Sequence, residues 1–193
     1  VTINDRDTQP LIWEVLERTH SRDRIEAYWW REILQAMLSI DPDRAIAIAC
    51  NAMFGNSYSF KEEAEKLLSR VAPEFPDQIM KHLGDVFMDD SKTRRLFITK
   101  VSSIFRQLPL DVVKKWLEET GVEGASRIAR HLPEPYVDED GQPRLHPLTE
   151  YVLTEFEDDD RTFQEFCAGV NSFRVYAGPL AEQRMKDADI ARQ

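Results

Sequence analysis

The sequence has few of the residues that build disulfide, metal or nucleotide sites. Its 193 residues include only two cysteines, Cys50 and Cys167, which are far apart and lie within apolar helical patterns. We expect two buried thiols, because neither a disulfide framework nor a metal-ligand spacing is present. Unpaired thiols of this kind are typical of a reducing compartment, so we expect a cytoplasmic location.

Long apolar runs and glycine-rich motifs are also missing. No stretch approaches the roughly 18 apolar residues that a membrane span needs, and no charged-then-apolar leader is found. Glycine occurs only seven times, and the motifs Gly-x-Ser-x-Gly, Gly-x-x-x-x-Gly-Lys and Gly-x-Gly-x-x-Gly do not occur. We therefore expect no membrane insertion and no nucleotide bound by a known loop.

The four histidines are widely separated and form no zinc-ligand pattern with each other or with cysteine. We expect no metal and no cofactor, and we predict that the chain is not an enzyme. One alternative stays open, because carboxylates on neighbouring helices would be able to act as general acid and base without a sequence signature.

Acidic residues outnumber basic ones, 35 to 25, and the net charge is −10. This excess opposes nonspecific attraction to nucleic acid and to anionic lipid. It is concentrated from Glu134 to Asp160, where ten acidic residues accompany the single base Arg144. The acidic run at 157–160 precedes a predicted helix, where carboxylates accept hydrogen bonds from backbone amides, so we expect capping there and no metal.

Apolar residues follow the 3.6-residue helical period in nearly every segment, and no segment alternates in the way that a strand does. The sequence therefore predicts an all-α protein. Asp41 is expected to cap a helix that has Pro42 in its first turn, and Ser59 with Glu62 has the spacing of a capping box. The expected helices are approximately 8–20, 23–40, 42–54, 59–72, 76–88, 91–108, 109–121, 124–132, 147–156, 160–170 and 179–193.

The predicted helix 23–40 is apolar almost all round, which is typical of a helix covered on two sides. Tryptophans occupy two consecutive positions in it, Trp29 and Trp30. Helical spacing places Trp30 beside Leu34 and Met37, and we expect Trp116 to lie in the core as well.

A period of 34 residues runs through the middle of the chain. It relates Asp43, Asp77 and Asp111 near helix starts, and it also relates Met37, Val71 and Phe105 near helix ends. Pro42 matches Pro76, and Pro109 comes one place early. The apolar sets that correspond are Ala45, Ala49, Ala52 and Met53, then Ile79, Leu83, Val86 and Phe87, then Val113, Leu117, Thr120 and Gly121.

On these residues, the region of about 23–190 resembles the HEAT and armadillo class of α-solenoids. The resemblance implies an α-solenoid of about five antiparallel helix pairs with one long loop insertion. Tetratricopeptide repeats share the period, but their Trp, Leu-Gly and Tyr positions have no counterparts here. An irregular helical bundle is the other alternative.

We expect a single helical-repeat domain over residues 1–193. Its parts would be a cap helix at 1–22, regular helix pairs at 23–132, an inserted loop at 133–147 and further pairs at 148–193. Because the chain begins at Val1 and ends at Gln193 within a predicted helix, we expect a fragment of a longer chain. A terminal repeat would then leave one apolar face for the rest of that chain, for a partner, or for self-association.

The resemblance implies a non-catalytic protein-interaction scaffold or sensor module, since HEAT-like arrays act as arms in large bacterial multidomain proteins. The inserted loop is the expected contact element, because loops that interrupt a repeat project from one face. Asp140 and Gly141 predict a tight turn there, between short extended segments. The candidate contact residues are Tyr136, Asp138, Glu139, Asp140 and Arg144.

The alternative function is nucleic-acid binding by a HEAT-like solenoid. Arg95 and Arg106 would share one face of the predicted helix 91–108, and Lys92 and Lys115 would add charge. HEAT-like DNA glycosylases combine such basic residues with aromatic and acidic ones, but the acidic balance here departs from that family. Acidic residues in the flanking helices would also weaken a phosphate groove.

Overall fold

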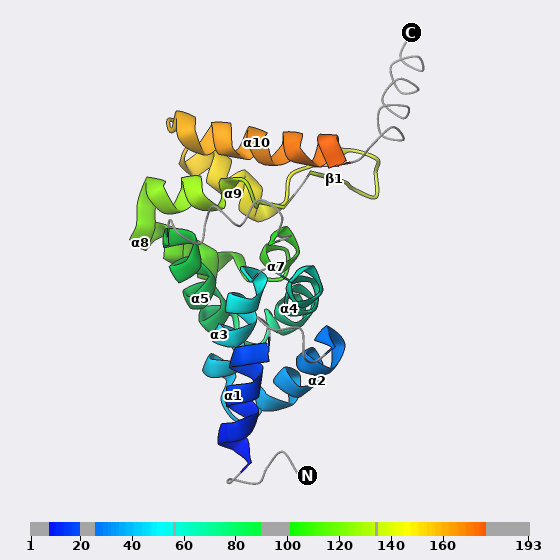
Figure 1. Cartoon of the computed structure of the whole chain (residues 1–193). Coiled ribbons are helices and arrows are strands. Elements are labelled where there is room, and N and C mark those ends of the chain that lie inside the picture. The colour runs from blue at the N-terminus through cyan, green and yellow to red at the C-terminus, as the bar shows by residue number, and fades with distance from the viewer. Residues whose placement is uncertain (1–7, 20–25, 56, 90–100, 134, 177–193) are drawn as a thin grey trace. The chain divides into compact units, whose positions relative to one another are not determined.

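The computed structural model describes residues 8–19, 26–55, 57–89, 101–133 and 135–176. These residues form nine helices and one pair of two-residue strands (Figure 1), so the expectation of an all-α protein is confirmed. The chain divides into two compact units, Val1–Thr120 and Gly121–Gln193, which we call the first and second units.

The first unit is a succession of helices that contact one another in a regular order. The helix α2 contacts α3 and α4, α3 contacts α4 and α5, and α4 contacts α7; α1 contacts α2. The helices are α1 (Gln9–Thr19), α2 (Ala27–Met37), α3 (Pro42–Met53), α4 (Tyr58–Val71), α5 (Pro76–Met88), α7 (Ser102–Phe105) and the first part of α8 (Leu110–Ala129).

Local signals set the start of α3 as expected. The Asp41 carboxylate accepts a hydrogen bond from the Arg44 amide at 3.0 Å, and Pro42 occupies the first turn. The expected capping box at Ser59 is wrong, because α4 begins two residues earlier, after Ser57. The Ser57 carbonyl accepts the first helical bond, from the Lys61 amide, so Ser59 already lies inside the helix.

The core of the first unit contains the positions that the 34-residue period relates. The buried sets are Met37, Val71 and Phe105; Ala45, Ile79 and Val113; and Ala49, Leu83 and Leu117. The rings of Phe87 and Phe105 stack at 5.9 Å, and the two rings are fully buried. The related positions Thr120 and Gly121 are only half-buried.

The two tryptophans of α2 differ in burial. Trp30 is fully buried, contacts Phe60 edge to face at 5.4 Å and donates its indole N–H to the Leu16 carbonyl. Trp29 is 58% exposed and Tyr28 is 50% exposed. The expectation that this helix is covered on two sides is therefore wrong.

The expected helix 91–108 lies largely outside the described residues. Its described end contains only the short helix α7, followed by a turn in which the Leu108 amide bonds to the Ile104 carbonyl. The expected end of the helix 109–121 coincides with Gly121, which has φ 59° and ψ −145° and interrupts α8. Glycine adopts this left-handed conformation at little cost, whereas residues with a Cβ do not.

The second unit comprises the end of α8, a small hairpin, α9 (Pro147–Glu155) and α10 (Asp160–Tyr176). Asp159 caps α10, since its carboxylate accepts bonds from the Thr162 amide at 2.8 Å and the Thr162 hydroxyl at 2.6 Å. These bonds lower the pKa of Asp159, which agrees with the capping role expected for this acidic run. The expected helix 179–193 lies outside the described residues.

Gly169 brings α10 very close to the backbone at the end of α8. A Cβ at this position would collide with the carbonyl group of Arg130. One turn earlier, Glu165 forms an ion pair with Arg130 at 2.7 Å. The second unit therefore depends on a backbone contact that only glycine permits.

Only one of the two cysteine thiols is buried as expected. Cys50 is buried, and this burial raises the pKa of its thiol far above the ordinary value. Cys167 is only half-buried, so the expectation of two buried thiols is wrong for this residue.

Candidate functional site

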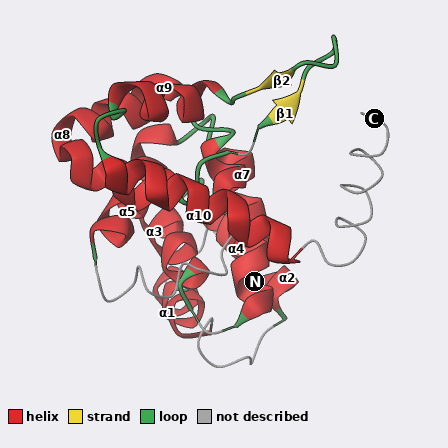
Figure 2. Cartoon of the chain, turned by 90° about the horizontal axis from the view of Figure 1, so that it is seen from above, coloured by secondary structure: helices red, strands yellow, loops and turns green. Residues whose placement is uncertain are grey.

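The inserted loop forms a short antiparallel hairpin, as the Asp140–Gly141 turn predicted. Strand β1 (Tyr136–Val137) pairs with β2 (Pro143–Arg144), and Gly141 has φ 78° at the turn. The hairpin extends away from α9, as Figure 2 shows. At its base, the buried Thr149 hydroxyl of α9 donates to the Pro133 carbonyl at 2.8 Å.

Asp138 organises the turn from within. One carboxylate oxygen accepts from the amides of Asp140 at 3.1 Å and Gln142 at 2.7 Å, and the other accepts from Arg144 Nε at 2.9 Å. The Arg144 bond is the largest cause of the lowered pKa of Asp138, and the two backbone amides add to it. Asp138 and Arg144 therefore hold the shape of the hairpin.

The other candidate contact residues of the hairpin face solvent. Tyr136 is 48% exposed, and Glu139 and Asp140 are exposed at the turn. Arg144 is bonded to Asp138 but is 62% exposed, so of the five residues singled out in the sequence only Asp138 is largely covered. A fixed turn with one aromatic ring and two carboxylates offers a small acidic contact element.

The basic stripe is only partly described. Lys92 and Arg95 lie outside the described residues. Arg106 follows the last residue of α7 and is exposed, and Lys115 is exposed on α8. The hypothesis of a shared basic face stays a prediction.

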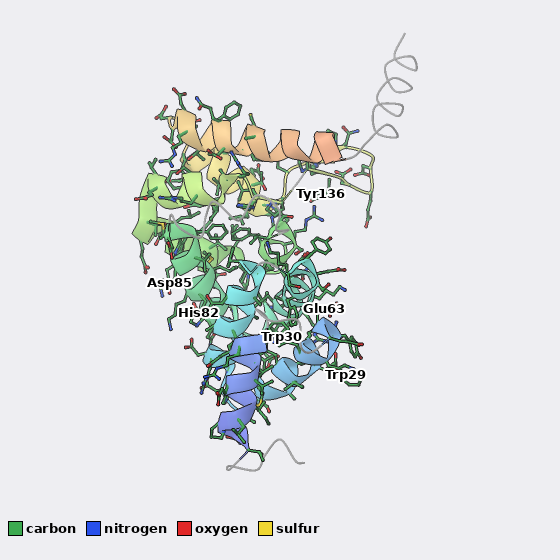
Figure 3. The ribbon with its side chains drawn as sticks, in the orientation of Figure 1. Trp29, Trp30, Glu63, His82, Asp85 and Tyr136 are labelled. Carbon is green, nitrogen blue, oxygen red and sulfur yellow. The ribbon has the colours of Figure 1, made fainter. Side chains whose placement is uncertain are left out.

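An exposed aromatic surface on α2 was missed by the sequence reasoning. The rings of Tyr28 and Trp29 meet edge to face at 5.4 Å, and Tyr58 at the start of α4 is 66% exposed. Figure 3 shows Trp29 on the outer side of α2, with Trp30 directed toward the neighbouring helices. The only sequence signal was an apolar pattern too wide for one buried face.

Arg31 fixes the edge of this aromatic surface. Its guanidinium lies 4.9 Å from the Tyr28 ring centroid, forms an ion pair with Glu63 of α4 at 2.7 Å and bonds to Glu32. The hydrogen bond to Glu32 and the charge of Glu63 raise the pKa of Arg31, although partial burial opposes them. The side chain is 17% exposed, so its charge is neutralised at the α2–α4 contact.

A second polar cluster connects α3 with α5. Asp43 Oδ1 lies 3.0 Å from His82 Nε2 and 3.3 Å from Lys81 Nζ. Partial burial opposes ionisation of Asp43, but the hydrogen bonds and charges of His82 and Lys81 outweigh it and lower its pKa. A carboxylate beside a histidine is one element of acid–base chemistry, but Asp43 is 54% exposed at the surface, so we interpret the cluster as a link between helices.

Among the residues that the structure describes, no three His, Cys, Asp or Glu side chains are grouped in a way that would hold a metal ion. The described helices include none that is both long and apolar enough to span a membrane.

The chain was also compared with known proteins. No protein family, no curated protein and no solved structure matches it.

Proposed function

We propose that the chain is a module of HEAT-like helix pairs, a non-catalytic scaffold or sensor that binds other proteins. The observation that carries this proposal is the recurrence of contacts at about one 34-residue period. Five side-chain links between helices join residues 34 to 39 apart in the sequence: Ser69 to Ser103, Arg70 to Gln35, Glu65 to Ser103, and Asp43 to Lys81 and His82. Two ion pairs between helices have shorter separations, 32 residues for Arg31 with Glu63 and 27 for Arg44 with Glu17.

The same recurrence supports a stack of pairs over an irregular bundle. If each pair is a copy of the one before, a residue contacts its counterpart about one period later. The first helix of one pair then packs against the first helix of the next pair, and the second against the second. The contacts of α2 with α4, of α3 with α5 and of α4 with α7 have this form. An irregular bundle would give no reason for separations that gather near one period.

The exposed features of the surface are the reason to propose protein binding for this architecture. Stacked pairs present extended faces, which such proteins use to bind partners. This chain adds an exposed aromatic surface on α2 and the hairpin at Tyr136, Glu139 and Asp140. Both are contact features, and the acidic balance favours a protein partner over nucleic acid.

Affinity capture of the tagged chain from its own source, with and without nuclease, tests this function. We expect a stoichiometric protein that survives nuclease and is lost at high salt or after substitution of surface residues. A matched pair of variants locates the contact: one carries Tyr136→Ser, Glu139→Lys and Asp140→Lys in the hairpin, and the other carries Trp29→Ala on α2. Capture that disappears with nuclease would overturn the proposal in favour of the nucleic-acid alternative, and then Arg106→Glu with Lys115→Glu should abolish binding.

A further inference from the structure

The contact between α2 and α4 shows how one helix of this chain covers the next. Trp30 contacts Phe60 near the beginning of both helices, Arg31 pairs with Glu63, and Gln35 accepts from Arg70 near their ends. The two helices therefore run in the same direction. The stripe of α4 that faces α2 consists of Phe60, Glu63, Leu67 and Arg70.

The 34-residue period relates this stripe to a stripe on α2 itself. We call it the outer stripe, and it consists of Glu26, Trp29, Ile33 and Ala36. On α4, the side chain of Glu63 pairs with Arg31 of α2 and is only 13% exposed, and Leu67, one turn later on the same stripe, is buried. The counterpart of Glu63 on α2 is Trp29, which is 58% exposed, and Ile33 is half-buried.

We propose that the outer stripe binds an amphipathic α-helix of a partner protein, whose apolar face is flanked by lysine or arginine. The inference rests on the proposed function and names the site and the class of partner. The helix would lie on α2 as α2 lies on α4, and so would continue an interface that the chain already contains. Trp29 would be its central contact, since large aromatic side chains dominate the energy of such interfaces.

The charges beside the stripe favour a basic partner. Glu26 precedes α2, is exposed and makes no capping hydrogen bond with its side chain. Arg31, the basic residue of this helix nearest to Trp29, is turned to Glu32 and Glu63. A second copy of the chain is a poorer occupant, because each copy carries a net charge of −10 and would bring the same Glu26 to the contact.

The test uses the full chain and a synthetic helical peptide of leucine and lysine, with leucine on one face. The chain has four tryptophans, so its NMR spectrum holds four indole N–H signals, and Trp29→Phe identifies one of them. We expect this signal to shift with the peptide while that of Trp30, bonded to the Leu16 carbonyl, stays in place. A peptide with glutamate in place of lysine should not bind.

A matched pair of variants measures the contribution of the stripe. Trp29→Ala should lower the affinity for the leucine–lysine peptide by at least about tenfold. Phe163→Ala should leave the affinity unchanged, because Phe163 is equally exposed, at 59%, but lies on α10. Equal affinity in both variants, or a shift of other indole signals alone, would overturn the inference.

Two further results separate this inference from the proposed function. A protein captured from lysate that still binds Trp29→Ala but not the hairpin variant would overturn the α2 site and leave the scaffold function standing. A dimer that sedimentation detects in the parent chain but not in Trp29→Ala would show that the occupant is a second copy. Absence of any captured protein would overturn the proposed function instead.

Discussion

The helices of the two units are held together by different kinds of contact. In the first unit, side chains at related positions fill the core, and polar links recur at about one period, from Arg70 to Gln35 and from Ser69 to Ser103. In the second unit, Gly169 brings α10 onto the Arg130 carbonyl, and a hairpin interrupts the helices. The first unit depends on the volume of buried side chains, including those 34 residues apart, whereas the second depends on a single close backbone approach.

Replacing the two neighbouring tryptophans of α2 should have the most unequal effects. Trp30→Ala removes a fully buried ring and its bond to Leu16, so we expect a loss of about 3 to 5 kcal/mol in the free energy of unfolding. Trp29→Ala should change it by less than about 0.5 kcal/mol, because the ring is exposed. Denaturant unfolding measures both, and equal losses would contradict the assignment of the covered and outer faces.

Replacing one glycine in each unit by alanine compares the two kinds of packing directly. Gly169→Ala places a Cβ against the Arg130 carbonyl, which cannot rotate away, and should cost about 2 to 3 kcal/mol. Gly84→Ala in the first unit meets the Trp116 indole, a side chain, and should cost about 1 to 2 kcal/mol.

A double-mutant cycle tests the side-chain origin of the second cost. In a Trp116→Ala background, Gly84→Ala should become neutral or stabilising, because alanine is the better helix former by about 1 kcal/mol. A cost at Gly84 that persists without the indole, or a Gly169→Ala variant as stable as the parent, would contradict the comparison.

Acid should weaken the second unit through His131. Burial, with a smaller contribution from the Arg130 charge, lowers the pKa of His131 from 6.5 to about 4. Above pH 6.5, His131 is neutral in both the folded and the unfolded chain. As the pH falls from 6.5 toward 4, the unfolded chain binds a proton at His131 more readily than the folded chain does, so the free energy of unfolding decreases. The expected loss at pH 5 is about 1 to 2 kcal/mol.

Unfolding of the parent chain and of His131→Gln, each at pH 7.5 and at pH 5, checks this dependence. The glutamine variant should show the smaller loss between the two pH values. An equal loss in both proteins would assign the acid sensitivity to other groups.

The sequence was informative wherever a few neighbouring residues decide the conformation. Asp41 with Pro42, the break at Gly121 and the turn at Asp140–Gly141 are local signals, and the structure has each of them. The start of α4 was misplaced because Ser57 and Ser59 are both acceptable caps, and the choice depends on which carbonyl takes the first helical bond.

The candidate site was less predictable because burial depends on neighbours distant in the sequence. Trp29 and Trp30 are chemically identical, and only the positions of α1 and α4 decide which ring is covered. The residues of the hairpin were found because prolines and Gly141 mark it, but the internal role of Asp138 needed the geometry of its three hydrogen bonds.

The account depends most on the 34-residue period as a unit of stacking, and duplicating one period tests it. A second copy of residues 55–88, inserted after residue 88, adds one α4–α5 pair and preserves the α3–α4 type of connection. Because stability in a repeat array is a sum over pairs and their contacts, we expect the longer chain to gain helix in proportion and to unfold in one transition, with no lower midpoint. Circular dichroism during thermal unfolding measures both quantities.

The control carries Leu67→Asp and Leu83→Asp in the added copy only, and it should lose the added helix. An insert that remains unfolded without those substitutions, or that lowers the midpoint of the whole first unit, would contradict the stacked arrangement.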